Sequence, residues 1–168
     1  MSIVVAAQAQ SDHTNAIKLN PLSIIFSTGN VAYEKAIASN QSIQLGGFYS
    51  GVSLGGIKYA GWGVTPEYRL YFGGKAMHGG YVAPFGRYQS FKLTDKEAGT
   101  KESFTSIGGG AVLGWEKAWS SGFVLDLFAG PSYNSGTFKS TDGDPEFDIK
   151  GGINGFGVRT GISLGFSF

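Results

Sequence analysis

The sequence lacks several features on which common protein functions depend. It contains no cysteine, which excludes disulfide bonds and thiolate metal sites. Its 13 basic and 12 acidic residues leave a formal charge of +1, so no excess of one sign points to nucleic acid or another polyanion as a partner. No apolar run approaches the ~18 residues that a membrane-spanning helix needs. If the chain spans a membrane, it therefore does so as a β-barrel.

Glycine and aromatic residues, by contrast, are abundant. The 168 residues include 28 glycines, 13 phenylalanines, 8 tyrosines and 3 tryptophans. Glycine recurs too often for helices of normal length, and so many aromatic residues argue against a disordered chain. The length fits one domain. The composition therefore predicts a single all-β domain, which we place at residues 13–168.

Residues 1–12 are expected to lie outside this domain. An apolar run from Ile3 to Ala7 leads into the small-x-small pattern that ends at Ala9, which resembles the end of a secretory signal. No basic residue precedes Lys18, so the basic region of a complete signal is missing. We interpret the segment as the remnant of a signal peptide; the alternative is an ordinary N-terminal extension.

The segment GVRTGISLGFSF, residues 157–168, alternates between large apolar side chains and small or polar ones. A period of two predicts a strand with one apolar face. The segments 62–73 and 123–134 repeat this pattern. The apolar face of the final segment carries Phe168, Phe166, Leu164 and Ile162.

Alternating segments separated by turn-rich stretches continue along the whole chain from residue 14. Helical periodicity is absent throughout, and each segment is long enough for the ~9–11 residues with which a tilted strand crosses hydrocarbon. This pattern predicts an eight-stranded antiparallel up-and-down transmembrane β-barrel. The expected strands lie at 15–26, 29–38, 42–54, 60–73, 80–92, 103–117, 122–135 and 153–168.

Charged residues within these strands share a face with glycine rather than with the large apolar residues. The interior of an eight-stranded barrel is narrow, so aromatic side chains would crowd it, whereas glycine and serine leave room for a few long charged chains. We therefore expect charge inside and an apolar wall facing lipid, the reverse of a soluble lipocalin-like barrel. The charged residues assigned to the interior are Lys18, Glu34, Glu67, Arg69, Arg87, Glu116, Asp126 and Arg159.

This interior set contains equal numbers of basic and acidic residues. Ionised groups that leave water must be paired, and matched numbers favour an ion-pair network that fills the barrel over a channel with an excess of one sign. We expect Lys18 and Glu34 to lie in water at the rim of the barrel. The predicted core of the network consists of Glu67, Arg69, Arg87, Glu116, Asp126 and Arg159.

The lengths of the predicted connections suggest how the barrel is oriented. Transmembrane barrels of this kind have short periplasmic turns and longer outer loops. The short connections are expected at 38–41, 74–79 and 118–122, and the longer ones at 93–102 and 135–152, with a tight connection near 27–29. This arrangement predicts that both termini are periplasmic.

The chain resembles the small eight-stranded outer-membrane barrels of Gram-negative bacteria, in the style of OmpX or the transmembrane domain of OmpA. In particular, it resembles an uncharacterised Bacteroidetes-type family, through the stretches IKLNPLSI at 17–24, VAYEKAI at 31–37, PEYRLYF at 66–72 and the terminal GISLGFSF. The resemblance implies an outer-membrane location and a final strand, with Phe168, Phe166 and Leu164, that the barrel-assembly machinery recognises. It implies no activity.

Motifs for catalysis or metal binding are weak. The two histidines, His13 and His78, fall in the N-terminal segment and in a predicted turn, and no G-x-S-x-G sequence occurs. We therefore predict that the protein is not an enzyme and needs no cofactor. A weak Ca²⁺ candidate is the acidic loop with Asp142, Asp144 and Asp148, which lacks the EF-hand spacing; a merely solvated loop is the alternative.

These observations favour a non-enzymatic structural or accessory protein of the outer membrane, such as a subunit of a larger envelope assembly. Small wall positions, including Gly47 and Gly109, would let another membrane protein pack closely. The alternatives are a porin-like channel for small solutes and a surface protein that binds or adheres through its loops. The expected partners are outer-membrane lipid or lipopolysaccharide, the barrel-assembly machinery and other outer-membrane proteins, but no nucleic acid.

Overall fold

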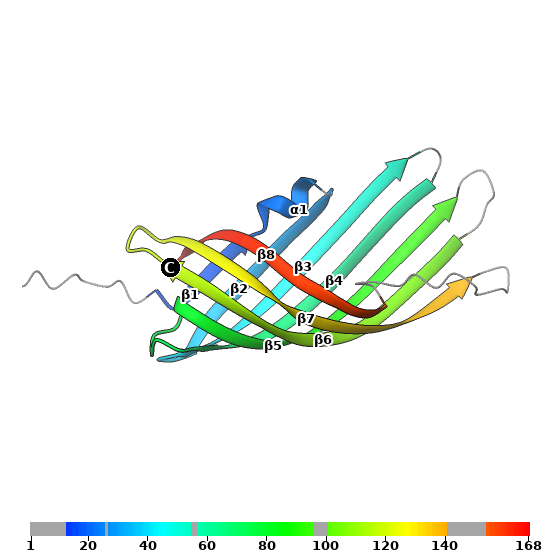
Figure 1. Cartoon of the computed structure of the whole chain (residues 1–168). Helices are drawn as coiled ribbons and strands as arrows, with labels where there is room; N and C mark the ends of the chain where they lie inside the picture. Colours follow the sequence, from blue (N-terminus) through cyan, green and yellow to red (C-terminus); the bar gives the residue numbers. More distant parts are fainter. Residues whose placement is uncertain (1–12, 26, 55–56, 96–100, 141–153) are drawn as a thin grey trace, which may run out of the picture.

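The computed structural model is a closed antiparallel barrel of eight strands, as the alternation predicted (Figure 1). It describes residues 13–25, 27–54, 57–95, 101–140 and 154–168. Each strand pairs with the next along the chain, and the last pairs with the first. The strands are β1 (Asn15–Leu19), β2 (Thr28–Ala38), β3 (Gln41–Leu54), β4 (Ile57–Tyr71), β5 (His78–Asp95), β6 (Lys101–Ala118), β7 (Phe123–Ser140) and β8 (Gly155–Ser167).

The first strand is shorter than predicted, and a short helix follows it. The prediction of a strand over 15–26 is wrong because β1 ends at Leu19, and α1 (Pro21–Ile25) lies where the second half of that strand was expected. The tight connection predicted near 27–29 overlaps β2, which begins at Thr28. Proline has no backbone N–H for the ladder but is well suited to the first position of a helix. Asn20 caps this helix, since its Oδ1 accepts a hydrogen bond from the Leu22 N–H at 3.1 Å. Among the described residues, no helix is long and apolar enough to cross a bilayer.

At the opposite ends of the strands, the two longer connections are shorter than predicted. The expected loop at 93–102 begins and ends inside strands, because β5 runs to Asp95 and β6 starts at Lys101. The expected loop at 135–152 likewise overlaps β7, which continues to Ser140. Threonine and phenylalanine in these stretches favour the strand conformation. The three short turns near the termini lie where predicted, within two residues.

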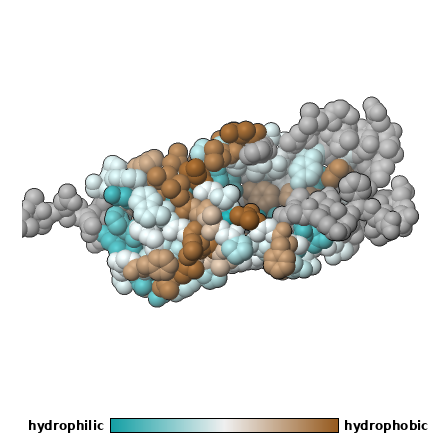
Figure 2. Space-filling model, in the orientation of Figure 1, coloured by the Kyte–Doolittle hydropathy of each residue, from teal (hydrophilic) through white to brown (hydrophobic). Residues whose placement is uncertain are grey.

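The barrel wall is apolar on the outside, and its exposure alternates as the sequence predicted. Along β8 every second side chain is exposed, including Phe156 at 82% and Val158 at 77%, while the residues between them turn inward. Figure 2 shows apolar side chains over the middle of the visible face and more hydrophilic ones toward the end that carries the C-terminus. Large apolar residues therefore meet the surroundings, and the polar ones are enclosed.

The interior has three parts along the barrel. At the end near the termini, Ala16, Met77 and Val124 form a small buried apolar cluster. Charged side chains and two tyrosines lie above it. Further along, the rings of Phe48, Tyr59, Phe91 and Phe104 stack on one another, with centroids 5.5–6.4 Å apart.

Glycine on facing strands makes room for the inward-pointing rings. A Cβ at Gly114 would overlap the ring of Tyr81, and one at Gly61 would overlap the ring of Phe91. Gly122 lies in the turn before β7 with a φ of 89°, a conformation that side chains other than glycine rarely adopt. The high glycine content is therefore a packing requirement of a narrow barrel filled with large side chains.

Candidate functional site

Arg69 lies at the centre of an ion network inside the barrel. It projects inward from β4 and is fully buried. Its Nε donates a hydrogen bond to Glu67 Oε1 at 2.7 Å. Its Nη1 contacts Glu116 Oε2 at 2.7 Å, Asp126 Oδ2 at 2.8 Å and Glu34 Oε2 at 3.2 Å. A single guanidinium thereby joins carboxylates from β2, β4, β6 and β7 across the lumen.

Lys18 supplies a second buried cation from β1. Its Nζ contacts Asp126 Oδ2 at 3.1 Å and Glu116 Oε1 at 3.2 Å, and it also donates to Glu34 Oε2. The expectation that Lys18 and Glu34 lie at a hydrated rim is wrong, because they are 1% and 0% exposed. The turn residue Met77 is itself buried with Ala16 and closes this end of the lumen, so water does not reach the charges.

Two tyrosines and a serine complete the coordination of the carboxylates. The Tyr81 hydroxyl donates to Asp126 Oδ1 at 2.7 Å, and Ser42 donates to Glu34. The Tyr71 hydroxyl lies 2.7 Å from both Glu34 Oε1 and Glu116 Oε2. A hydroxyl has one proton, so both contacts are hydrogen bonds only when one of the two carboxyls carries a proton of its own.

Sequence reasoning did not assign these hydroxyl groups to the network. Their positions in the strands could have indicated that they point inward. Tyr71 follows Arg69 on the inward face of β4, and Tyr81 is an inward-facing residue near the start of β5. Alternation shows that such a side chain points inward. It does not show which carboxylate from a distant strand lies at the same height.

Arg159 extends the network toward β8. Its Nη1 donates to Glu67 Oε2 at 2.5 Å, so Glu67 is held between Arg69 and Arg159. The guanidinium also lies over the rings of Phe85 and Phe128, at 4.4 and 4.7 Å from their centroids. Such stacking favours arginine over lysine at this position.

Arg87 is the one member of the predicted core that the structure does not bring into the network. Its Nε lies 3.4 Å from Thr65 Oγ1, and it makes no ion pair with a described residue. It lines a polar cavity of about 90 Å³ together with Arg159, Gln44 and Asn30. The buried Gln44 Oε1 has no protein partner there. A cavity of this size and polarity has room for several water molecules.

Among the described residues, the ion network joins seven charged side chains by direct contact. Linked by direct contact are the carboxylates of Glu34, Glu67, Glu116 and Asp126 and the cations of Lys18, Arg69 and Arg159. Each of these carboxylates contacts at least one of the cations. Neither histidine reaches the network, since His78 opens β5 at the turn and His13 precedes β1.

The remaining sequence-predicted sites lie away from the network. Phe168, Phe166 and Leu164 are exposed on the outside of the wall. The acidic residues Asp142, Asp144 and Asp148 fall outside the described residues, so the structure does not place the Ca²⁺ candidate. Within the described ranges, no group of three or more histidine, aspartate or glutamate side chains is arranged to hold a metal ion.

Comparison with known proteins gives one match. The model of a family described as a protein of unknown function (DUF3575) matches residues 1–144, which takes in the strands from β1 to β7. No curated protein and no solved structure is significantly similar to the chain.

Proposed function

The chain belongs to the DUF3575 family of proteins of unknown function, and we propose that it is a non-enzymatic structural or accessory β-barrel of the Gram-negative outer membrane. In this proposal the barrel spans the bilayer in the manner of OmpX or the transmembrane domain of OmpA, and the ion network fills its lumen. Both termini face the periplasm, and residues 1–12 are the remnant of a secretory signal.

The observation that carries the proposal is the inverted distribution of polarity. Four carboxylates and three cations are enclosed, while large apolar side chains such as Phe156, Val158 and Ile107 are exposed. In water this arrangement would be unfavourable twice, because buried ions lose solvation and exposed apolar surface costs about 25 cal/mol per Å². In lipid the same wall is well solvated, and the closed ladder leaves few backbone groups without partners.

The filled lumen argues for a structural role rather than a pore. The cross-lumen contacts of Arg69 and Lys18, at 2.7–3.2 Å, leave no passage at their level. An eight-stranded barrel is just wide enough for side chains to fill. The surfaces left to act are then the outer wall and the outer loops, through which the protein would contact lipid, lipopolysaccharide or other envelope proteins, after insertion by the barrel-assembly machinery.

The first experiment tests the membrane location. The protein is refolded from urea into phospholipid vesicles, and heated and unheated samples are compared on a denaturing gel. We expect heat-modifiable migration, and retention in the membrane after extraction with alkaline carbonate. A protein that stays monomeric and soluble without detergent would overturn the proposal and favour a soluble barrel.

A second experiment distinguishes the structural role from the porin-like alternative. The polar cavity beside Arg87 favours the alternative, because it continues the polar lumen beyond the network. In planar bilayers we expect little or no steady conductance from the wild type. The contrary result would be large, uniform single-channel steps that persist when Arg87 is replaced with alanine. These would show that the network does not close the lumen, and a channel would then be the better proposal.

A further inference from the structure

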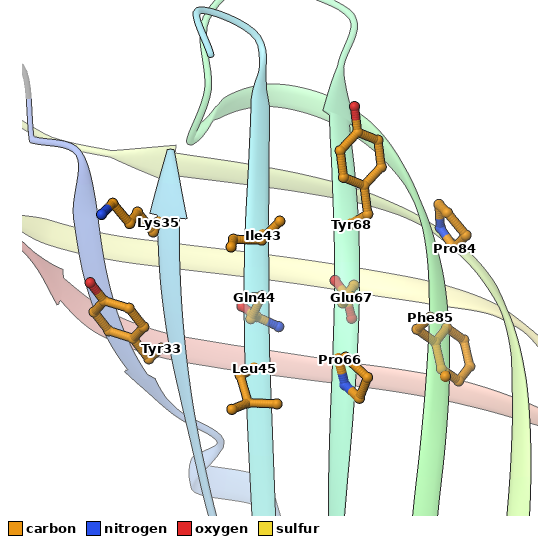
Figure 3. A pocket seen from close by; sticks show the side chains of 11 residues that line it. Tyr33, Lys35, Ile43, Gln44, Leu45, Pro66, Glu67, Tyr68, Pro84 and Phe85 are labelled. Atoms are coloured by element: carbon orange, nitrogen blue, oxygen red, sulfur yellow. The ribbon is translucent and has the colours of Figure 1, made fainter. Parts of the chain in front are cut away.

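A groove of about 630 Å³ lies on the outer wall over strands β2 to β5 (Figure 3). Pro66 lies beside Leu45 in the β3–β4 register and next to Gly86 on the other side. Tyr33, Tyr68 and Phe85 are the aromatic residues that line it. Small or short side chains thus sit between larger ones, which makes a depression in an otherwise even wall.

The groove has a clear cause in the sequence. Pro66 and Pro84 have no backbone N–H, and the β4–β5 pairing is interrupted around them, with Glu67↔Phe85 the one pair between Val64↔Tyr88 and Leu70↔Val82. Gly86 adds no side chain to the outer surface. A Cβ built there would meet only Pro66 Cγ, at 3.9 Å, so a larger residue would fit and would fill the groove.

One end of the groove carries a positive charge near the barrel end that holds the termini. Lys35 is exposed, and it faces Asn15 in the β1–β2 register. The Tyr33 hydroxyl donates to Asn15 Oδ1 at 2.6 Å, and the Asn15 N–H donates to the Phe168 carbonyl at 3.1 Å. In the proposed orientation, this end lies at the periplasmic surface of the bilayer, at the level of lipid phosphates.

We propose that this groove binds one phospholipid of the periplasmic leaflet, with the phosphate on Lys35 and an acyl chain along Pro66, Pro84 and Gly86. The inference rests on the proposed membrane location. It follows from the pairing of a cation at headgroup level with an apolar depression that leads away from it. Apart from Lys35, no charged side chain that lines the groove points outward.

A second copy of the chain fits the groove less well than a lipid. The four carboxylates whose side chains the structure describes are all buried in the ion network. The described part of the wall therefore offers no acidic group to Lys35 of another copy. A lipid phosphate supplies the missing negative charge, and its acyl chain supplies the apolar surface.

The test measures lipid retained by the intact protein. Wild type and variants in detergent micelles are titrated with phosphatidylglycerol, and bound lipids are counted by native mass spectrometry. We expect one retained lipid on the wild type and about fivefold less retention for Lys35→Ala, the effect of one cation near a membrane surface. Gly86→Leu, which fills the groove, should abolish retention.

Matched controls place the same changes elsewhere. Lys117→Ala removes another basic residue near this end of the barrel, where Lys117 lies over the Trp119 ring. Gly47→Leu enlarges another small wall position, where a Cβ would meet nothing nearer than 3.8 Å. Both controls should retain lipid as the wild type does. Equal lipid retention by all four variants would overturn the inference. The inference would also be overturned if the wild type formed a dimer that Gly86→Leu abolished while lipid binding stayed unchanged, because a second copy of the chain would then occupy the groove.

The outcome also separates this inference from the proposed function. Each protein is first inserted into vesicles and tested for heat-modifiable migration. If all of them insert normally and retention does not depend on Lys35 or Gly86, the groove assignment is wrong while the membrane location stands. If the wild type does not insert, both are wrong.

Discussion

Replacing Arg69 with methionine tests whether the ion network holds the barrel together. Methionine is also long and unbranched, but it lacks the charge and the donors. The substitution leaves Glu67, Glu116 and Asp126 without contacts of 2.7–2.8 Å. These side chains are almost completely buried, so water does not replace the lost donor. Removing one partner of a buried ion pair typically costs ~3–5 kcal/mol, and we expect the free energy of unfolding to fall by that amount.

The assay is urea unfolding of vesicle-inserted protein, followed through its tryptophan fluorescence. The control is Lys117→Met, which removes a cation that lies 5.4 Å from the Trp119 ring and should cost about 1 kcal/mol or less. If Arg69→Met fails to insert, the same measurement is made on the double variant Arg69→Met/Glu116→Gln. Because it removes one of the negative charges that Arg69 balanced, it should insert and recover part of the stability. The reasoning is refuted if Arg69→Met unfolds within 1 kcal/mol of the control, since the charges would then be hydrated.

Two further substitutions test the composition and the packing of the interior. Glu116→Gln should lower the urea midpoint less than Glu67→Gln does. The network has one carboxylate more than it has cations, and Glu67 is the carboxylate that holds both Arg69 and Arg159. Equal decreases in the two midpoints would contradict this reasoning. Gly114→Val should cost ~1–3 kcal/mol by overpacking against the Tyr81 ring, in the same unfolding assay. An unchanged midpoint would show that Tyr81 moves aside freely.

The sequence was sufficient to predict the number of strands and, in the later strands, the faces on which their residues lie. Alternation is a local property, so the inward position of Arg69 and the outward position of Val158 follow from parity alone. The same parity explains why glycine shares the inner face with charged residues: a Cβ at Gly114 has no room beside Tyr81. Strand number followed from counting such segments along the chain.

The arrangement of the network was harder to predict, because it depends on how far each strand is shifted against its neighbours. The sequence suggested a hydrated rim for Lys18 and Glu34, yet the stagger of the strands places them in the network with Asp126. Met77, in a turn, closes the lumen beneath them. Arg87 was correctly predicted to point inward, but the structure places no carboxylate of the described residues in contact with it. The short helix after Leu19 was signalled by Asn20 and Pro21, but the apolar run that follows them suggested a strand.

The seam between the first and last strands is where the network matters most for assembly. β1 pairs with β8 at four positions only, Ala16 to Leu19, which is little ladder to close a barrel. Lys18 adds contacts from this strand to Glu116 on β6 and Asp126 on β7, beyond the neighbouring β8. The ion network therefore helps to hold the closing strand in place.

Replacing Lys18 with methionine should consequently slow barrel closure more than it lowers final stability. Lys18 contacts three carboxylates and Arg69 contacts four, so the loss of unfolding free energy should be smaller than for Arg69→Met. Closure, however, must proceed without the cross-lumen contacts of β1. The measurement is the rate at which the compact, heat-modifiable form appears on unheated gels during refolding into vesicles, with Lys117→Met as the control. If Lys18→Met reaches the compact form as fast as the control, the four-position ladder closes the barrel unaided, and the role assigned to Lys18 is wrong.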